Sequence, residues 1–332
     1  MTGLRFAVLG SNSFTGSHFV DALLEGGHEV LGLSRSPEPA GVFLPYRWTP
    51  ERSRRFTFRQ IDLNLQLDEL AQALDDARPD YLVNFAAQSM VAQSWQQPAH
   101  WFQTNVIGIV KLCEHLRKAN YLKRYVHVST PEVYGSFEGR LAENTHYNPS
   151  TPYATSRAAA DLHLSTLHRT FGFPVLLTRA ANVFGPGQQL YRIIPRTILC
   201  ILTGRKLSLD GGGRSLRSFI HVRDVCEGTL QAALRGEPPA IYHLSTDRVV
   251  TVREVVELIC SRMSASFAEV VEIKDDRPGK DLAYVLDSAK ARRELDWTDR
   301  VSLEAGVDAT IGWARANLAS LQAQTWDYVH KP

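Results

Sequence analysis

The chain has 332 residues, of which 44% are hydrophobic, and this apolar content can bury one large core or two modest ones. Lysine and arginine total 37 against 35 for aspartate and glutamate, so the net charge of +2 provides no global field that would favour nucleic acid or an acidic membrane. Any anionic ligand must therefore be held by local groups.

The four cysteines are widely spaced and form no C-x-x-C pair, which is typical of buried free thiols in a reducing compartment. A strand-like run begins at Leu4 without a basic leader before it, and no apolar stretch approaches the roughly 20 residues that span a bilayer. These features predict a cytoplasmic protein with no membrane partner.

Strand-like and helical patterns alternate along the first half of the chain. Strands are expected at residues 5–10, 29–33, 56–61, 81–85, 124–129 and 175–178. Helices are expected at residues 16–25, 67–74, 101–118 and 153–171. Because a βαβ alternation builds a parallel sheet with helices on both faces, the sequence predicts an α/β fold, a doubly wound parallel sheet of the Rossmann type.

The pattern changes near residue 180 to an irregular, glycine-rich stretch with short strands and with helices expected at 252–263 and 303–318. We expect residues 1–180 to form a dinucleotide-binding domain and residues 181–332 a smaller α/β lobe that binds substrate. Strands at 219–222 and 240–245 are expected to return to the first domain, so that the two parts are interleaved.

A Gly/Ser-rich turn follows the first strand and leads into a helix, where backbone N–H groups and the helix dipole can hold a pyrophosphate. The candidate cofactor residues of this turn are Gly10, Asn12, Ser13, Phe14, Thr15 and Gly16. A plain β-α turn is the alternative. Asp62 and Leu63 follow the third strand, where such folds contact the adenine, although an Asp at a strand end is usually a turn former.

The second strand ends in Ser34, Arg35 and Ser36, at the place where an NAD-specific site carries an Asp or Glu on the ribose 2′-hydroxyl. Hydroxyls and an arginine suit a 2′-phosphate instead, so NADP is the preferred cofactor. NAD stays open, because Arg35 could also be a solvated loop charge.

A carboxylate, a hydroxyl and a Tyr/Arg pair occur close together in the middle of the chain, as Thr130, Glu132, Tyr153 and Arg157. Tyr153 and Arg157 are four residues apart and share one face of the expected helix, so the guanidinium can stabilise a phenolate. Tyr153 is therefore expected to act as a base near neutral pH. His127 is expected in the core, and the histidines show no metal-ligand spacing.

With these residues in hand, the chain resembles the extended short-chain dehydrogenase/reductases, and among them the nucleotide-sugar 4,6-dehydratases that act on dTDP-glucose and GDP-mannose. The resemblance runs nearly end to end. Beside the two catalytic stretches, it rests on motifs at residues 84–89, 104–108, 182–187, 217–224 and 276–281 with Asp287.

The resemblance implies that Tyr153 and Arg157 also contact the cofactor, and that Thr130 and Glu132 contact the sugar. Further cofactor contacts implied by it are Ala86, Ala87 and Gln88. Further contacts to a nucleotide-diphosphate sugar are Gln88, Ser89, Asn182, Arg196, Arg217 and Arg277. Members pair through two helices, here about 101–118 and 153–171, so a homodimer is expected.

Three positions depart from the family pattern. Ser13 replaces the middle glycine of the pyrophosphate turn, and we expect this change to be tolerated. Arg157 replaces the catalytic lysine and keeps its charge, although arginine does not deprotonate. Pro131 stands where the dTDP-glucose enzymes carry an acid; the GDP-mannose enzymes lack that acid as well.

The expected activity is dehydration of an NDP-hexose to an NDP-4-keto-6-deoxyhexose, with Glu132 removing the C5 proton after transient oxidation at C4. A decarboxylase, an epimerase or a 5,6-dehydratase would use the same 4-keto intermediate, and these alternatives stay open. A non-catalytic NADP-binding regulator is a further alternative, which the joint presence of Thr130, Glu132 and Tyr153 disfavours.

Overall fold

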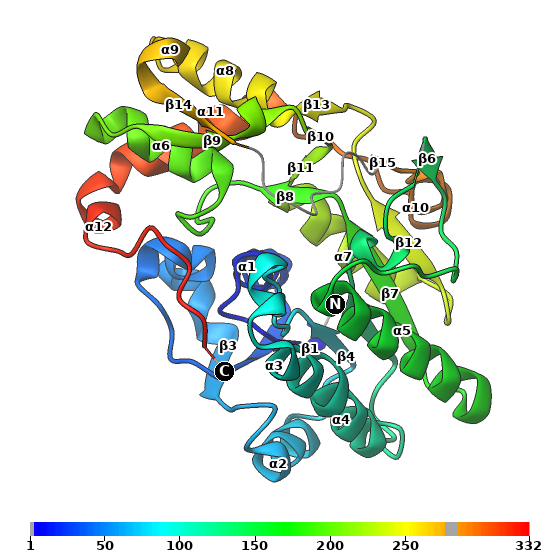
Figure 1. Ribbon diagram of the computed structural model, residues 1–332. Coiled ribbons are helices and arrows are strands. Elements are labelled where there is room, and N and C mark those ends of the chain that lie inside the picture. Colours follow the sequence, from blue (N-terminus) through cyan, green and yellow to red (C-terminus); the bar gives the residue numbers. More distant parts are fainter. Residues whose placement is uncertain (1–2, 138, 276–284, 332) are drawn as a thin grey trace.

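The computed structural model describes residues 3–137, 139–275 and 285–331. Its centre is a seven-stranded parallel sheet in the order β12-β7-β5-β4-β1-β2-β3 (Figure 1). In this spatial order the strands are β12 (Ile241–Leu244), β7 (Val175–Ala180), β5 (Arg124–Val128), β4 (Tyr81–Asn84), β1 (Arg5–Leu9), β2 (Glu29–Ser34) and β3 (Phe56–Gln60). The predicted doubly wound sheet is therefore confirmed.

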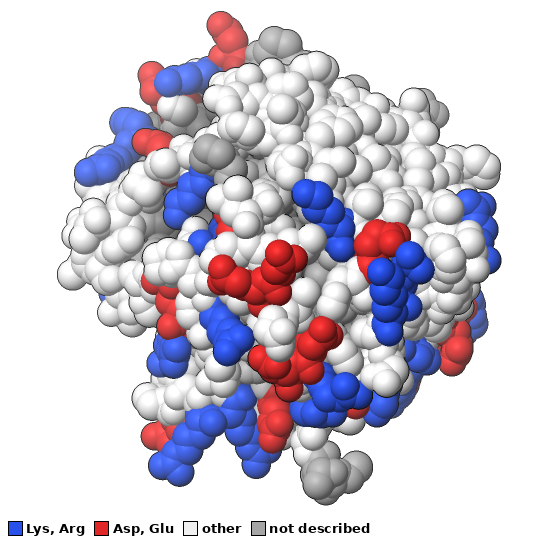
Figure 2. Space-filling model, turned by 90° about the horizontal axis from the view of Figure 1, so that it is seen from below, with Lys and Arg blue, Asp and Glu red and all other residues white. Residues whose placement is uncertain are grey.

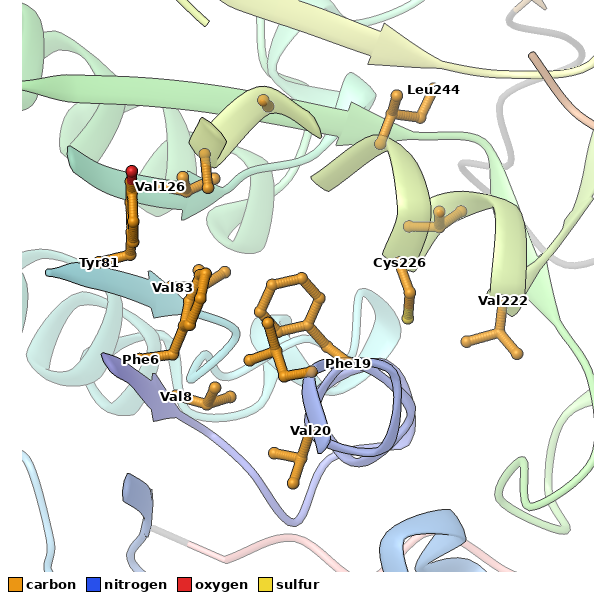
Figure 3. Close-up of a cluster of buried hydrophobic side chains, with 14 of the residues drawn as sticks. Phe6, Val8, Phe19, Val20, Tyr81, Val83, Val126, Val222, Cys226 and Leu244 are labelled. Atoms are coloured by element: carbon orange, nitrogen blue, oxygen red, sulfur yellow. The ribbon is translucent and has the colours of Figure 1, made fainter. Parts of the chain in front are cut away.

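Helices cover both faces of the sheet, which is why its central strands are continuous apolar runs. One face packs against α1 (Phe14–Glu25), α7 (Val222–Arg235) and α10 (Ala289–Leu295). Figure 3 shows Phe19 of α1 between Val8 and Val83 of the sheet, on the left, and Cys226 of α7, on the right. The opposite face packs against α2 (Leu67–Ala77), α4 (Ile109–Leu116) and α5 (Pro152–Phe171).

A second core lies outside the sheet and belongs to the smaller lobe, which forms the upper part of Figure 1. Its helices are α6 (Ile193–Thr203), α8 (Val252–Arg262), α9 (Phe267–Val270), α11 (Leu303–Ala316) and α12 (Leu318–Gln322). Its small strand pairs are β8 (Asn182–Phe184) with β11 (Phe219–His221), β9 (Leu207–Asp210) with β14 (Val271–Lys274), and β10 (Leu216–Arg217) with β13 (Val250–Thr251). A further pair, β6 (Arg140–Leu141) with β15 (Val285–Leu286), joins distant segments.

The two segments expected to return to the sheet differ. The strand Ile241–Leu244 lies beside β7 in parallel register, as expected. The expected strand at 219–222 does not join the sheet, because Phe219–His221 pairs with Asn182–Phe184; Phe219 buries in the second core and Ile220 in the first. The chain then re-enters the larger unit through α7.

Short helical turns occupy many of the connections. They are η1 (Gly41–Phe43), η2 (Pro45–Arg47), η3 (Pro50–Arg55), η4 (Ala92–Trp95), η6 (Pro131–Tyr134) and η7 (Gly211–Gly213). The helix expected at 101–118 is instead divided into α3 (Pro98–Phe102), the π-helical η5 (Gln103–Gly108) and α4. The cause is Asn105, whose amide donates to the Gln88 carbonyl at 3.0 Å and to Ser156 Oγ at 2.9 Å, and so draws the backbone toward the sheet.

Charged side chains follow the balanced composition. Figure 2 shows basic and acidic groups interspersed over the lower and left parts of the face seen from below, and a largely uncharged area at its upper right. No single-sign field extends across that face. In the described part of the chain, no helix is both long enough and apolar enough to cross a membrane.

Candidate active site

A cleft of about 360 Å³ lies at the carboxyl ends of β1, β2, β3 and β4, where the strand order reverses. Its size is that of a small-molecule site, since such pockets span ~300–1,000 Å³. Most of the predicted cofactor residues line it together: Gly10, Asn12, Ser13, Ser34, Arg35, Ser36, Asp62, Leu63, Ala86, Ala87 and Gln88. Ser89 also lines it, and Phe14, Thr15 and Gly16 form the adjoining first turn of α1.

The turn after β1 makes two very close backbone approaches. Gly10 has φ +82°, and a Cβ there would lie 2.6 Å from the Ala86 nitrogen. A Cβ on Gly16 would lie 2.3 Å from the Gly10 carbonyl oxygen. Ser13 stands between them and is the N-cap of α1, its Oγ accepting from the Gly16 N–H at 3.1 Å. The serine in place of a glycine is therefore used by the fold as a helix cap.

Three polar residues at the end of β2 make different hydrogen bonds. Ser34 is buried, and its hydroxyl accepts from the Asn12 N–H at 3.0 Å, so it holds the turn. The Ser36 carbonyl accepts from Asn12 Nδ2 at 3.0 Å. The Arg35 guanidinium donates to the Lys331 carbonyl at 3.1 Å. Asp62, after β3, accepts from the Asn64 N–H at 2.7 Å, which is the turn-forming role of such a residue.

The predicted catalytic residues come from η6 and from the first turns of α5. Thr130 is the buried N-cap of η6 and accepts from the Glu132 N–H at 3.3 Å, with Pro131 at the first position of the turn. Tyr153 lies in the first turn of α5, which Thr151 caps. Thr130 hydrogen-bonds the Tyr153 phenol, and the Glu132 carboxylate and the Arg157 guanidinium both act on it electrostatically. The structure thus brings the four residues together.

The pKa of Tyr153 is raised above its ordinary value, chiefly because the phenol is buried and also because Glu132 is near. Arg157, the Thr130 hydrogen bond and Arg192 lower it, but these effects do not outweigh burial. The protein's own residues therefore do not bring the pKa of Tyr153 below its ordinary value, and its role as the base stays a prediction. The phenol is protonated at neutral pH, and further positive charge is needed to ionise it.

Arg157 is 1% exposed, and its Nη2 donates to the Val128 carbonyl at the end of β5. Its Nε and Nη1 atoms are buried and have no hydrogen-bond partner among the residues that the structure describes. Buried guanidinium N–H groups are costly when unpaired, so these two donors indicate a place for a ligand oxygen. Together with the close glycine turn, they fit a dinucleotide whose ribose hydroxyls would lie beside Arg157.

A buried ion pair supports the loop that carries Thr130 and Glu132. Arg179 Nη2 donates to Asp161 Oδ2 at 2.9 Å, with both side chains at 0% exposure. Ser129, directly before Thr130, donates to the same carboxylate oxygen at 2.6 Å. At the other end of the loop, the Tyr134 hydroxyl hydrogen-bonds His243 Nε2 at 2.8 Å. Both ends of the loop are thus fixed to the sheet.

Asp161→Asn is expected to destabilise the protein by about 3–5 kcal/mol, because it leaves the Arg179 charge buried without a counter-ion. Asp247→Asn is the matched control, since Asp247 pairs with Arg140 at the surface, and such pairs contribute about 0–1 kcal/mol. Urea unfolding of the two variants and the parent measures both values. Equal losses in the two variants would contradict a structural role for the buried pair.

The predicted substrate residues divide into three groups. Asn182 and Arg217 lie close together, because the Asn182 N–H donates to the Ser218 carbonyl at 3.0 Å. Arg196 is engaged elsewhere: it donates to the Trp326 carbonyl and to Asp327 Oδ1 at 3.2 Å. Arg277 lies outside the described residues. The sequence did not predict a role for Arg192, the N-cap of α6, which lies one turn before Arg196. Its charge lowers the pKa of Tyr153.

Comparison with known proteins gives the same assignment as the geometry. The sequence profile of the family described as GDP-mannose 4,6 dehydratase matches residues 8–310. A dTDP-glucose 4,6-dehydratase of Streptomyces niveus is 33% identical over 323 residues, covering 95% of this chain and 94% of the relative.

Two solved structures show the same fold. DesIV, a dTDP-glucose 4,6-dehydratase of Streptomyces venezuelae with NAD bound, is 33% identical with a TM-score of 0.87, covering 96% of this chain and 98% of the other. A UDP-glucose 4-epimerase of Thermotoga maritima with UDP-glucose is 27% identical with a TM-score of 0.86, covering 95% of this chain and 100% of the other. The resemblance inferred from the motifs is confirmed: the chain belongs to the GDP-mannose 4,6-dehydratase family and, with it, to the extended short-chain dehydrogenase/reductases of the nucleotide-sugar 4,6-dehydratase type.

Proposed function

We propose that the chain is an NAD(P)-dependent 4,6-dehydratase that converts an NDP-hexose to an NDP-4-keto-6-deoxyhexose. The observation that carries the proposal is the placement of the Glu132 carboxylate and the Thr130 hydroxyl around the Tyr153 phenol. Oxidation at C4 needs only the phenol and a hydride acceptor, whereas elimination across C5 and C6 needs an additional acid/base group beside them. Relatives at 33% identity over nearly the whole chain are dTDP-glucose 4,6-dehydratases, which supports the same chemistry.

Tyr153 accepts the proton of the sugar C4 hydroxyl, and Thr130 orients the same oxygen. A nicotinamide dinucleotide, when bound, supplies the hydride acceptor and the positive charge that favours the phenolate. Arg157 stabilises that phenolate from the following turn of α5 and offers its two unpaired N–H groups to the ribose.

The elimination step falls to Glu132. A 4-ketone acidifies the C5 hydrogen, so the carboxylate removes that proton and C6 loses its hydroxyl as water. Because Pro131 occupies the position of the usual acid, Glu132 itself, once protonated, gives the proton to the leaving hydroxyl. The hydride then returns to C6, and the reaction is redox-neutral.

Incubation with a panel of nucleoside-diphosphate hexoses and hexuronates, followed by mass spectrometry, tests this assignment. The expected product has lost one water and no carbon. Loss of carbon dioxide would instead identify a decarboxylase, and a product of unchanged mass an epimerase. Neither of these enzymes needs a carboxylate in reach of C6.

The cofactor preference proposed from the sequence is NADP. It is supported by Arg35 and Ser36, which directly follow β2 and line the cleft. An NAD-specific site would carry an acidic residue at this place. NAD is bound in the related DesIV structure. Arg35→Ala is expected to weaken NADP binding ~10–100-fold and to change NAD binding little, because a charge-assisted hydrogen bond contributes about 1.5–3 kcal/mol. Calorimetric titration of both dinucleotides decides between them, and a parent protein that prefers NAD would overturn the preference.

Substrate binding across the cleft and pairing of two copies complete the proposal. Asn182 and Arg217 in the smaller lobe would bind the diphosphate. Residues 1–180 with the returning α7 and β12 would form the dinucleotide domain.

Homodimerisation is supported by apolar side chains exposed on α3, η5 and α5: Phe102, Ile107, Leu162 and Phe171. Leu164 and Leu167 are in the core and do not contribute. A cytoplasmic location is supported by four cysteines that are all free and buried.

A further inference from the structure

The chain beyond α12 crosses from the smaller lobe to the sheet. In Figure 1 this segment, in red, descends from α12 and ends beside β3. We name residues 326–331 the strap. Tyr328, Val329 and Lys331 of the strap line the same cleft as Gly10 and Ala86. The strap therefore forms part of the wall of the cleft proposed above for the dinucleotide.

The strap is held first by the smaller lobe. Arg196 of α6 donates to the Trp326 carbonyl and to Asp327. The Tyr328 ring meets the Tyr191 ring edge to face, with centroids 5.6 Å apart. Trp326 is itself part of the second core, so the start of the strap is fixed.

The strap then docks on α3 of the larger unit through His330. The His330 ring stacks on Trp101 with centroids 5.0 Å apart and an interplanar angle of 9°. Its Nε2 shares a hydrogen bond of 2.9 Å with His100 Nδ1, and its Nδ1 one of 3.1 Å with the Tyr328 hydroxyl. This is a specific docking site and not a loose covering.

The end of the strap takes hydrogen bonds from residues that the cofactor would use. The Lys331 carbonyl accepts from Gln88 Nε2 at 2.6 Å and from Arg35 Nη2 at 3.1 Å. Gln88 is 3% exposed, and this carbonyl satisfies its buried amide donor. Lys331 Nζ also lies 3.4 Å from Ser36 Oγ. One peptide group thus bridges the ends of β2 and β4 across the cleft.

We propose that the strap is an autoinhibitory segment that competes with the dinucleotide for the cleft. The proposal rests on the proposed function, because it takes Gln88 and Arg35 as cofactor contacts. A dinucleotide that takes hydrogen bonds from Gln88 and Arg35 must displace the Lys331 carbonyl from both donors. Its apparent affinity is then reduced by the fraction of molecules in which the strap is docked.

Cofactor binding to three proteins tests the strap directly. The full chain is compared by calorimetry with a variant that ends at Asp327 and with Lys331→Ala, each titrated with NAD and with NADP. The shortened variant is expected to bind roughly tenfold more tightly, because two hydrogen bonds and a ring stack no longer compete. Lys331→Ala keeps the backbone carbonyl but loses the Nζ contact to Ser36, so it is expected to tighten binding less than the shortened variant does. Equal or weaker binding by the shortened variant would show a cover that does not compete.

His330→Ala gives the same test without shortening the chain, and is expected to tighten binding a few fold because it removes the stack on Trp101 and the hydrogen bonds to His100 and Tyr328 while the Lys331 carbonyl remains. Hydrogen exchange supplies an independent readout: saturating cofactor is expected to speed exchange of amides 328–331, and slower exchange would overturn competition. If the full and shortened proteins bind equally and both dehydrate a nucleotide sugar, the strap alone is wrong. If neither binds a dinucleotide, the cofactor site is wrong and the strap with it.

Discussion

Glu132→Gln is expected to lower dehydratase turnover by roughly 10²–10⁴-fold while leaving oxidation at C4 intact. The amide cannot remove the C5 proton, so the reaction stops at the 4-keto stage with the cofactor reduced. A single-turnover experiment that follows nicotinamide absorbance at 340 nm measures this directly: the variant should show a rise that persists, where the parent shows at most a transient one.

The same substitution has a second consequence that a general loss of structure would not produce. Glu132 is the second cause that raises the pKa of Tyr153, after burial. Removing its charge lowers that pKa, so the pH at which C4 oxidation reaches half its maximal rate should fall in Glu132→Gln. Glu257→Gln, in a surface pair with Arg253 on α8, is the control and should change neither quantity. Full dehydratase turnover in Glu132→Gln would rule out the proposed role.

Tyr153→Phe is expected to abolish both half-reactions, with a loss of roughly 10²–10⁴-fold in the rate of C4 oxidation itself. Phenylalanine keeps the ring in its buried place at the start of α5 and removes only the oxygen, so the fold should be unaffected. No absorbance rise should appear in single turnover, in contrast to Glu132→Gln.

The control for this variant is Tyr121→Phe, which removes a hydroxyl bonded to Asp75 at the surface and should leave turnover unchanged. For the parent, the oxidation rate should rise with pH, because the pKa of Tyr153 lies above its ordinary value and the phenolate is the active form. If Tyr153→Phe still reduced the cofactor on adding a nucleotide sugar, another group would have to be the base.

The sheet and its site could be predicted because they follow local rules. The central strands of the first half are mostly buried apolar runs followed by turns, and parallel strands place those turns at one edge. Gly10, Asp62 and Gln88 therefore lie around one cleft, although the chain separates them widely. The four residues predicted to be catalytic also meet as expected, because η6 and the start of α5 follow directly from the capping residues Thr130 and Thr151.

Features that depend on tertiary packing could not be predicted from local pattern. The strand at 219–221 has the same apolar character as a sheet strand, and only its pairing with β8 separates the two cases. The high pKa of Tyr153 follows from the burial of its phenol, which the spacing of residues along a helix does not reveal. The strap carries no periodicity at all, and Gln88 meets Lys331 across 243 positions of sequence.

The central claim is that the Tyr153 phenol and the Glu132 carboxylate act on neighbouring carbons of one sugar. It is tested most directly by supplying a nucleotide hexose that carries deuterium at C4 and locating the label in the product. The account predicts a 6-deoxy-4-keto product with the deuterium in the C6 methyl group. Deuterium that stays at C4, or that is lost to solvent without reaching C6, would contradict it.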